Sequence, residues 1–450
     1  MLPGPVSLPM PSASSRPLSP TAAIALALVL TAPARATAAR EPVYAVVNCR
    51  IVTVSGPTID KGTLLLRDGV IAAVGTDVPI PPDARVLDAG GLTLTPGLID
   101  AFGSLGLPAP PRRSGRTDER PAAPAASPSP LAPEALVLSR IRVAEALEAR
   151  DAGITTALVV PREGIVPGRS VLLSLAGDRP EQLAWRQPFA LHLHMETLRR
   201  RYPSSLMGTL AHARQSLLDA RRYGEVWSAY EKSPSGRRRP EYDAGLAAWL
   251  DILEGRLPLV VTAPRENDVR RALTVADEFR IRLVVAGAPH AHRLAGLIKA
   301  RRLPLLVTVN YDPPVAPGFG SFGGDADEER ERKEIEEAER NPAALHEAGV
   351  RFALVSAHGR DFLAGVRKGI EKGLPREAAL RAVTLSAAEA LGIVDRTGSL
   401  DVGKAANVVA WSGEPLTKEA RPRMVFVDGA LYEPRERDSE DKRRGIPEER

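Results

Sequence analysis

The sequence has little cysteine and no long apolar run. Cys49 is the single cysteine in 450 residues, so no disulfide can form within the chain. Because Cys49 lies in a strand-like run, we expect it to pack in a core rather than act as a nucleophile. The apolar stretch 22–30 is shorter than the roughly 20 residues of a membrane-spanning helix, and no later segment is apolar enough to span a membrane. The sequence therefore predicts no membrane span once the N-terminal segment is removed.

Charge of one sign is not in excess either. The formal net charge is +5, and the basic and acidic residues are interleaved along the chain. A nucleic-acid-binding protein needs basic residues that gather on one surface. We therefore expect no nucleic-acid partner.

The N-terminal residues 1–38 have the pattern of a signal peptide. Arg16 precedes the apolar stretch, and Ala34, Ala36 and Ala38 supply the small residues that signal peptidase requires. The pattern predicts an exported protein, periplasmic or extracellular.

What the chain does have is 44% apolar residues, enough for a large core. Short runs rich in Val, Ile and Leu over 42–89 predict a meander of antiparallel strands. Its clearest hairpin is Thr63–Val74, whose Asp68-Gly69 turn tolerates positive φ. Residues 108–133, rich in Pro, Ala, Ser and Arg, predict a flexible insertion, and the charged residues 433–450 predict a tail without function.

The middle of the chain alternates amphipathic helices with short apolar strands. This alternation is typical of parallel strands joined by crossover helices, and it predicts an α/β fold, a (β/α)8 TIM-like barrel over about 95–395. Strands resume over 396–432, so we expect a small composite β-sandwich built from 42–94 and 396–432. The charge-dense segment Asp325–Arg340 predicts a solvated helix without chemistry.

Two stretches carry a family resemblance. Residues 94–101, Leu-Thr-Pro-Gly-Leu-Ile-Asp-Ala, resemble the entry into the first barrel strand of amidohydrolases of the imidazolonepropionase-like group. Residues 398–409, Gly-Ser-Leu-Asp-Val-Gly-Lys-Ala-Ala-Asn-Val-Val, resemble the return of that family to its β domain, with Asn407 where the family has Asp. The resemblance implies a divalent metal such as zinc at the C-terminal mouth of the barrel, where it activates water for hydrolysis of a C–N bond in a small amide.

The metal-ligand positions that the resemblance implies hold other residues. The first two histidines of the family fall on Phe102 and Ser104. The histidine of a middle strand falls on Thr262, and the aspartate of the last strand, which is also the general base, falls on Ala357. Phenyl and methyl groups have no donor atom, and a neutral hydroxyl is a poor zinc ligand. We therefore expect no bound metal and a loss of the usual catalysis.

Other histidines offer an alternative. The pairs His192/His194 and His290/His292 lie near predicted strand ends, and alternate residues of a strand share a side, so a relocated metal site with Glu196 or His358 is stereochemically allowed. The competing interpretation is that they are polar residues at strand ends and in a loop. His358 itself stands one residue beyond the missing aspartate, where it is a candidate metal-free base or an ordinary surface histidine.

Two functional hypotheses follow. In the first, an exported amidohydrolase-like chain has lost catalysis and survives as a pseudoenzyme, binding a small amide-like ligand or forming a homo- or hetero-oligomer with an intact homologue. In the second, the chain is a hydrolase with a relocated histidine metal site. The sequence does not identify the ligand, because specificity lies in loops without a recognisable pattern.

Overall fold

The computed structural model describes residues 42–108, 131–198, 202–311, 325–357 and 361–435. All of them belong to one compact unit, Glu41–Arg450. The predicted signal peptide lies outside the described residues, as do most of the predicted insertion, most of the charged tail and His358.

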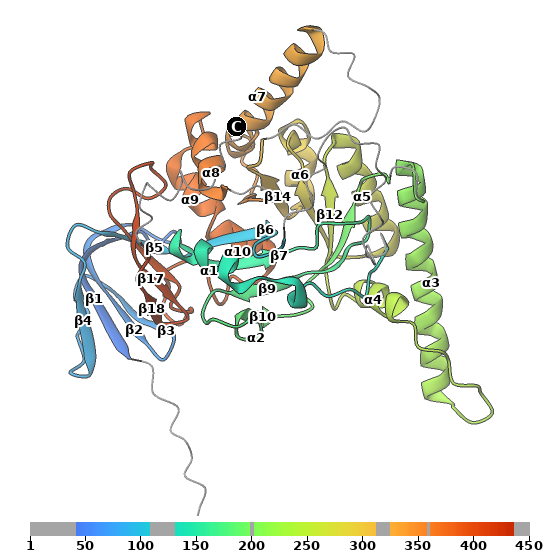
Figure 1. The fold of residues 1–450 in the computed structure, drawn as a ribbon, viewed down its shortest axis with the longest axis horizontal. Coiled ribbons are helices and arrows are strands. Elements are labelled where there is room, and N and C mark those ends of the chain that lie inside the picture. The colour runs from blue at the N-terminus through green and yellow to red at the C-terminus, as the bar shows by residue number, and fades with distance from the viewer. Residues whose placement is uncertain (1–41, 109–130, 199–201, 312–324, 358–360, 436–450) are drawn as a thin grey trace, which may run out of the picture. The chain divides into compact units, whose positions relative to one another are not determined.

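Strands from the two ends of the described chain share one eight-stranded sheet. The order is β18-β17-β16-β5-β1-β2-β3, and β4 pairs with β1. In Figure 1 the blue strands β1 to β3 and the red strands β17 and β18 accordingly lie together. The strands are β1 Val43–Ile51, β2 Ile59–Arg67, β3 Val70–Gly75, β4 Ala84–Asp88, β5 Thr93–Pro96, β16 Val408–Trp411, β17 Pro422–Val427 and β18 Ala430–Tyr432.

The predicted hairpin is confirmed. Strands β2 and β3 pair antiparallel, with Arg67 opposite Val70, and the turn residues Asp68 and Gly69 have φ of 51° and 76°. The expectation of a purely antiparallel meander is wrong, because β4 and β5 both pair parallel with β1. Residues 76–83 bring the chain from β3 to β4, and after residues 89–92 β5 continues along β1 in the same direction as β4. A two-layer sandwich stays a prediction.

The remaining strands form two further sheets. Their orders are β10-β9-β7-β6 and β15-β14-β13-β12-β11-β8. Hydrogen bonds link the sheets at two places, from Ala357 N to Phe102 O (2.8 Å) and from Ser170 N to Ala190 O (3.0 Å). The strands are β6 Leu98–Gly103, β7 Ile154–Val159, β8 Gly168–Arg169, β9 Val171–Ser174, β10 Ala184–Arg186, β11 Leu191–His194, β12 Leu259–Ala263, β13 Leu283–Gly287, β14 Leu305–Thr308 and β15 Ala353–Val355.

The parallel arrangement is confirmed in part. Neighbours from β11 to β15 are parallel, as are β6 and β7. Strand β9 runs antiparallel to β7, which corrects the expectation of crossover helices throughout. The connection 160–170 is too short to hold a crossover helix, so the chain turns back on itself.

Helices cover the parallel strands. In α5 the apolar residues Val269, Ala272, Leu273 and Ala276 are buried at the three- and four-residue spacing of one helix face. No helix in the described ranges is long and apolar enough to cross a membrane. The helices are η1 Leu138–Arg140, α1 Val143–Asp151, α2 Pro180–Leu183, α3 Leu206–Lys232, α4 Ala244–Leu253, α5 Glu266–Phe279, η2 Ala291–Leu294, α6 Ala295–Arg301, α7 Asp325–Glu347, α8 Phe362–Glu371, α9 Arg376–Ala382 and α10 Leu385–Leu391.

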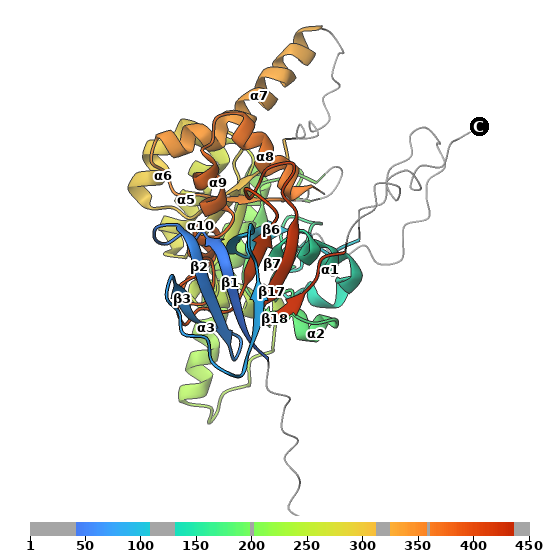
Figure 2. The same cartoon turned by 90° about the vertical axis from the view of Figure 1, so that its left-hand side faces the viewer.

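The predicted charged helix is α7. In both views its N-terminal part extends beyond α6 and α8 (Figures 1 and 2). Exposed ion pairs run along it, such as Lys333 with Glu329 at 2.8 Å. Its C-terminal part is buried instead, because Asn341 and Leu345 are 0% exposed. The helix therefore has a solvated end and a packed end.

Alternate residues of the parallel strands enter two different apolar clusters. On β12, Leu259, Val261 and Ala263 pack into an outer cluster that includes residues of α5, whereas Val260 packs into an inner cluster. Strands buried on both faces are typical of parallel sheets covered by helices. The inner cluster contains Ile99, Ala101, Phe102, Leu158, Val160, Leu172, Phe189, Ala190, Val260, Val284, Ala286, Leu306, Ala353, Val355, Ala387, Ala388 and Ile393.

Candidate functional site

The C-terminal ends of β6, β11, β12 and β15 carry the residues singled out in the sequence. Active sites of parallel α/β barrels lie at this end of the strands. The structure places Phe102 in β6, Ser104 directly after it, Thr262 in β12 and Ala357 just after β15. We call this region the strand-end mouth.

Phe102 is part of the packed interior. It is 1% exposed, belongs to the inner cluster, and its ring centroid lies 5.8 Å from that of His192. Its backbone carbonyl accepts the hydrogen bond from Ala357, which has a φ of 52°. The two positions of the first and last family ligands are therefore adjacent, and both side chains are hydrocarbon.

Ser104 and Thr262 keep polar atoms at the mouth. Ser104 is 7% exposed, and its hydroxyl accepts a hydrogen bond from the guanidinium of Arg162. The hydroxyl of Thr262 is buried and has no hydrogen-bond partner among the described residues. Its backbone carbonyl accepts from Met195 N at 3.0 Å. Of these two hydroxyls, that of Thr262 alone has no hydrogen-bond partner among the described residues.

An aspartate that the sequence analysis did not single out lies in the same region. Asp100 is 4% exposed and joins β6 to the end of β15, because Ser356 donates from its hydroxyl (2.5 Å) and from its backbone N–H (3.1 Å) to the carboxylate. Burial raises the pKa of Asp100, and these hydrogen bonds oppose that shift. The signal was present in the sequence: Asp100 is the one ionisable residue of the otherwise apolar strand Leu98–Gly103.

The pair His192/His194 faces the interior. Leu191 and Leu193 belong to the outer cluster, so the alternating histidines lie on the other side of β11, with His194 opposite Thr262. His194 is 3% exposed, and burial lowers its pKa to about 4, while a hydrogen bond to the backbone of Gly164 opposes the shift. Only its Nε2 has no hydrogen-bond partner in the described part of the chain. Nδ1 is therefore the nitrogen that donates to Gly164.

The pair His290/His292 contacts helix α7. His292 lies at 3.0 Å from the side-chain oxygen of Asn341 and at 3.1 Å from Glu337, both on α7. His290 Nδ1 lies 3.9 Å from the same Glu337, which also pairs with Arg293. These contacts attach η2 to α7.

The family metal does not fit the residues present. Phe102 and Ala357 offer no donor atom, and the hydroxyl of Ser104 already accepts from Arg162. Within the described ranges, no three His, Cys, Asp or Glu side chains are grouped so that they could hold a metal ion. The relocated histidine site stays a prediction, and its candidate His358 is outside the described residues.

Comparisons with known proteins agree on one family. A model of the amidohydrolase family matches residues 324–431. The curated protein amidohydrolase tasK of Hapsidospora irregularis is 25% identical over 418 aligned residues; the match covers 82% of this chain and 39% of that protein, so the chain spans about two fifths of its length.

Solved structures show the same fold. An amidohydrolase from Thermotoga maritima MSB8 superposes with a TM-score of 0.73 at 23% identity, covering 86% of this chain and 99% of that one. A putative prolidase from Bifidobacterium longum gives a TM-score of 0.56 at 17% identity, covering 89% and 97%. At these identities the likeness shows the fold, which is that of a TIM barrel.

Proposed function

We propose, for a chain that belongs to the amidohydrolase superfamily, that its strand-end mouth binds a small amide-like ligand without metal-dependent hydrolysis. One observation carries the proposal. Phe102, at the position of the first metal ligand, is a packed member of the inner cluster.

The energetics favour a metal-free interior. A divalent ion needs several donor atoms to replace its hydration, and an ion beside a phenyl ring and a methyl group lacks them. Burying the Phe102 side chain instead stabilises the fold by about 2 kcal/mol. Phe102 therefore stabilises the fold, and it offers no donor atom to a metal ion at this position.

The unsatisfied atoms indicate where a ligand binds. His194 Nε2 and Thr262 Oγ1 lie on neighbouring strands in the same register, and both are buried without a partner among the described residues. A buried polar atom left without a hydrogen bond costs about 1–3 kcal/mol. The neutral imidazole accepts a hydrogen bond and the hydroxyl donates one. An amide supplies the complementary N–H and C=O groups.

A second candidate, the relocated metal site, has one observation in its favour. A metal-binding histidine commonly donates its other ring N–H to a backbone carbonyl, which leaves a lone pair directed at the metal. The hydrogen bond from His194 to Gly164 and the unpartnered Nε2 have this form. A metal ion at His194 would need His192, on the same side of β11, as a second ligand.

Elemental analysis separates the two. The full chain, without a histidine tag, is dialysed against zinc and then against buffer, beside His192→Ala/His194→Ala and the matched control His290→Ala/His292→Ala. We expect far less than one zinc per chain in all three. One zinc per chain that is lost only in the first variant would sink the metal-free proposal and establish the relocated site.

Export and pairing complete the proposal. We infer that the chain is secreted and cut after about residue 38, and that it associates with itself or with an intact homologue. N-terminal sequencing of the exported protein tests the first inference, and an unprocessed N-terminus in the cytosolic fraction alone would contradict it.

Sedimentation of the purified chain, alone and mixed with an active homologue, tests the inferred association.

A further inference from the structure

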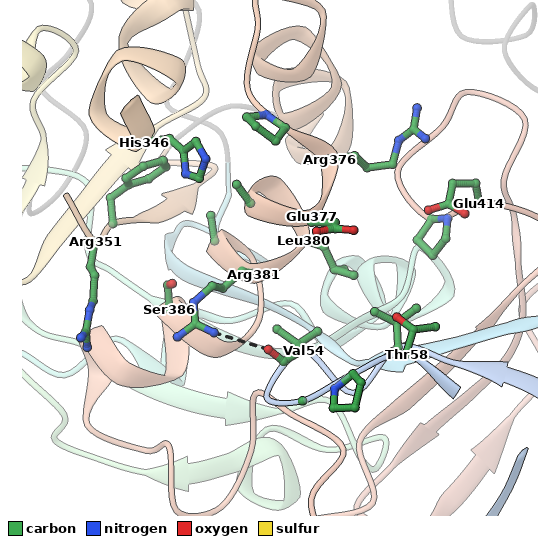
Figure 3. Close-up of a pocket in the computed structure, with 18 of the residues that line it drawn as sticks. Val54, Thr58, His346, Arg351, Arg376, Glu377, Leu380, Arg381, Ser386 and Glu414 are labelled. Carbon is green, nitrogen blue, oxygen red and sulfur yellow. Dashed lines mark hydrogen bonds between the residues drawn. The ribbon is translucent and has the colours of Figure 1, made fainter. Parts of the chain in front are cut away.

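A pocket of about 710 Å³ opens on the side where β15 begins. Its wall includes the β1–β2 loop around Val54, the residues before β15 such as Arg351, and helix α9 (Figure 3). The mouth residue Ala357 follows the other end of β15. The pocket is therefore separate from the strand-end mouth, and its volume is in the range of small-molecule sites.

The wall of this pocket is rich in arginine. Four arginines line it, against two glutamates. One glutamate, Glu414, is engaged by Arg50 at 2.7 Å. Arg381 donates to the carbonyl of Val54 at 3.4 Å and pairs with Glu389 at 3.1 Å. Arg50 and Arg381 are thus paired with carboxylates, and the wall as a whole holds four arginines against two glutamates.

Two of the guanidinium groups remain available. Arg351 has a side chain that is 83% exposed, and its carboxylate neighbour Glu389 is 4.0 Å away. The side chain of Arg376 makes no hydrogen bond or ion pair with the described residues. Figure 3 shows Arg351 and Arg376 on opposite sides of the pocket, with Arg381 between them.

We propose that this pocket binds a small polyanion, a molecule with two or more carboxylate or phosphate groups. Guanidinium groups bind both kinds of oxyanion through paired N–H donors. Because the arginines are spread around the wall, a ligand with several anionic groups can contact more than one of them, whereas a single small anion cannot. This site is independent of the ligand proposed for the mouth.

Calorimetric titration of the full chain tests the proposal, with citrate and pyrophosphate as probes in low-salt buffer. The test variant is Arg351→Gln/Arg376→Gln. The control is Arg270→Gln/Arg332→Gln, which removes the same charge from exposed arginines outside the pocket. We expect saturable binding at one site per chain, weakened at least about tenfold in the test variant. The control should change affinity by less than about twofold, because distant surface charges are screened.

A third variant changes the affinity in the opposite direction. Glu377→Gln removes a carboxylate of the pocket wall and should tighten binding of the probes. Saturation by citrate alone or by pyrophosphate alone identifies the carboxylate or the phosphate source. Equal weakening in the test and control variants would show diffuse attraction to a basic surface and overturn the proposal. So would the absence of saturable binding of either probe to the wild-type chain, whose fold is checked by circular dichroism.

Discussion

The two His-x-His pairs share a sequence pattern but lie in opposite surroundings. His192 and His194 are 0% and 3% exposed on β11, beside the inner apolar cluster. His290 and His292 flank the start of η2, with side chains 19% and 22% exposed, and both lie close to Glu337. Burial lowers the pKa of His194 to about 4, whereas Glu337 and Asn341 of α7 contact the second pair.

The comparison shows how far the His-x-His spacing determines the position of the two side chains. Two histidines at alternate positions share a side only when the chain is extended, and only β11 is extended. Around η2 the ring centroids lie 6.5 Å apart at an interplanar angle of 72°, and both rings approach Glu337 on α7. The surroundings of each pair, which the motif alone does not give, therefore decide its chemistry.

We expect the largest change in stability from a substitution of Phe102, which packs near the buried pair His192/His194. Phe102→Ala removes a ring that is packed against the inner cluster and near His192, and we expect it to lower the free energy of unfolding by about 4 kcal/mol. Guanidinium titration measures the change. Phe102→Leu, which keeps most of the volume, should lose less than about 1.5 kcal/mol. A loss below about 1 kcal/mol in the alanine variant would show that the ring is not packed, and would remove the main support for a metal-free interior.

The next effect is a pH dependence that His194 should show more strongly than the exposed pair. The folded-state pKa of His194 is lowered to about 4, below its ordinary value of 6.5, so the unfolded chain binds the proton more tightly. Its contribution to stability is complete above pH 6.5 and is lost as the pH falls towards 4. The loss amounts to about 3 kcal/mol over this window.

Denaturant titrations at several pH values measure this slope. His194→Gln, which cannot be protonated, should reduce the slope by more than the exposed-pair variant His290→Gln does, because Glu337 opposes the lowering of the His290 pKa by partial burial. If both variants had the slope of the wild-type chain, the inference that His194 is buried in its neutral form would be wrong. If both flattened it equally, the contrast between the pairs would fail.

Much of the fold was predictable, because it depends on local patterns. The Asp68-Gly69 hairpin and the alternation of apolar residues on β12 follow from turn geometry and strand period. The reversal at β9 was missed because a short apolar strand has the same pattern in either direction. Parallel pairing of β4 with β1 was missed for the same reason.

The site was predictable only in part. The resemblance located Phe102, Ser104, Thr262 and Ala357, and the structure places all four near strand ends. It did not indicate that Ser356 bonds Asp100 or that Arg162 bonds Ser104, because these contacts join residues 256 and 58 positions apart. Such pairings depend on tertiary packing, which no local pattern encodes.

A smaller effect is expected for the amide that holds the exposed pair. Asn341 is 0% exposed; its side-chain oxygen accepts from the backbone N–H of His292 at 2.9 Å, and its nitrogen donates to Ala288 O. Asn341→Ala should cost about 2 kcal/mol, because it leaves buried groups without partners. Asn341→Asp keeps the acceptor but loses the donor and places a carboxylate at a 0% exposed position, so its loss should be at least as large. Unfolding free energies that are equal for all three chains would contradict this attachment of η2 to α7.

The smallest effect should come from Glu337, although three basic side chains, His290, His292 and Arg293, lie within 4 Å of its carboxylate. Its carboxylate contacts His292 and Arg293, and Arg293 is the main cause of the lowered pKa of Glu337. A lowered carboxylate pKa stabilises the fold above the unfolded value of 4.5, and this stabilisation disappears as the pH falls through the folded-state value. Because Glu337 and Arg293 are 33% and 45% exposed, solvent screening should reduce the loss in Glu337→Gln to below about 1 kcal/mol, and added salt should reduce it further. A loss of unfolding free energy that exceeded the acid-induced change assigned to His194, and that persisted at high salt, would reverse the comparison. The exposed pair would then be the more strongly coupled one, and burial would not be the property that distinguishes the two histidine pairs.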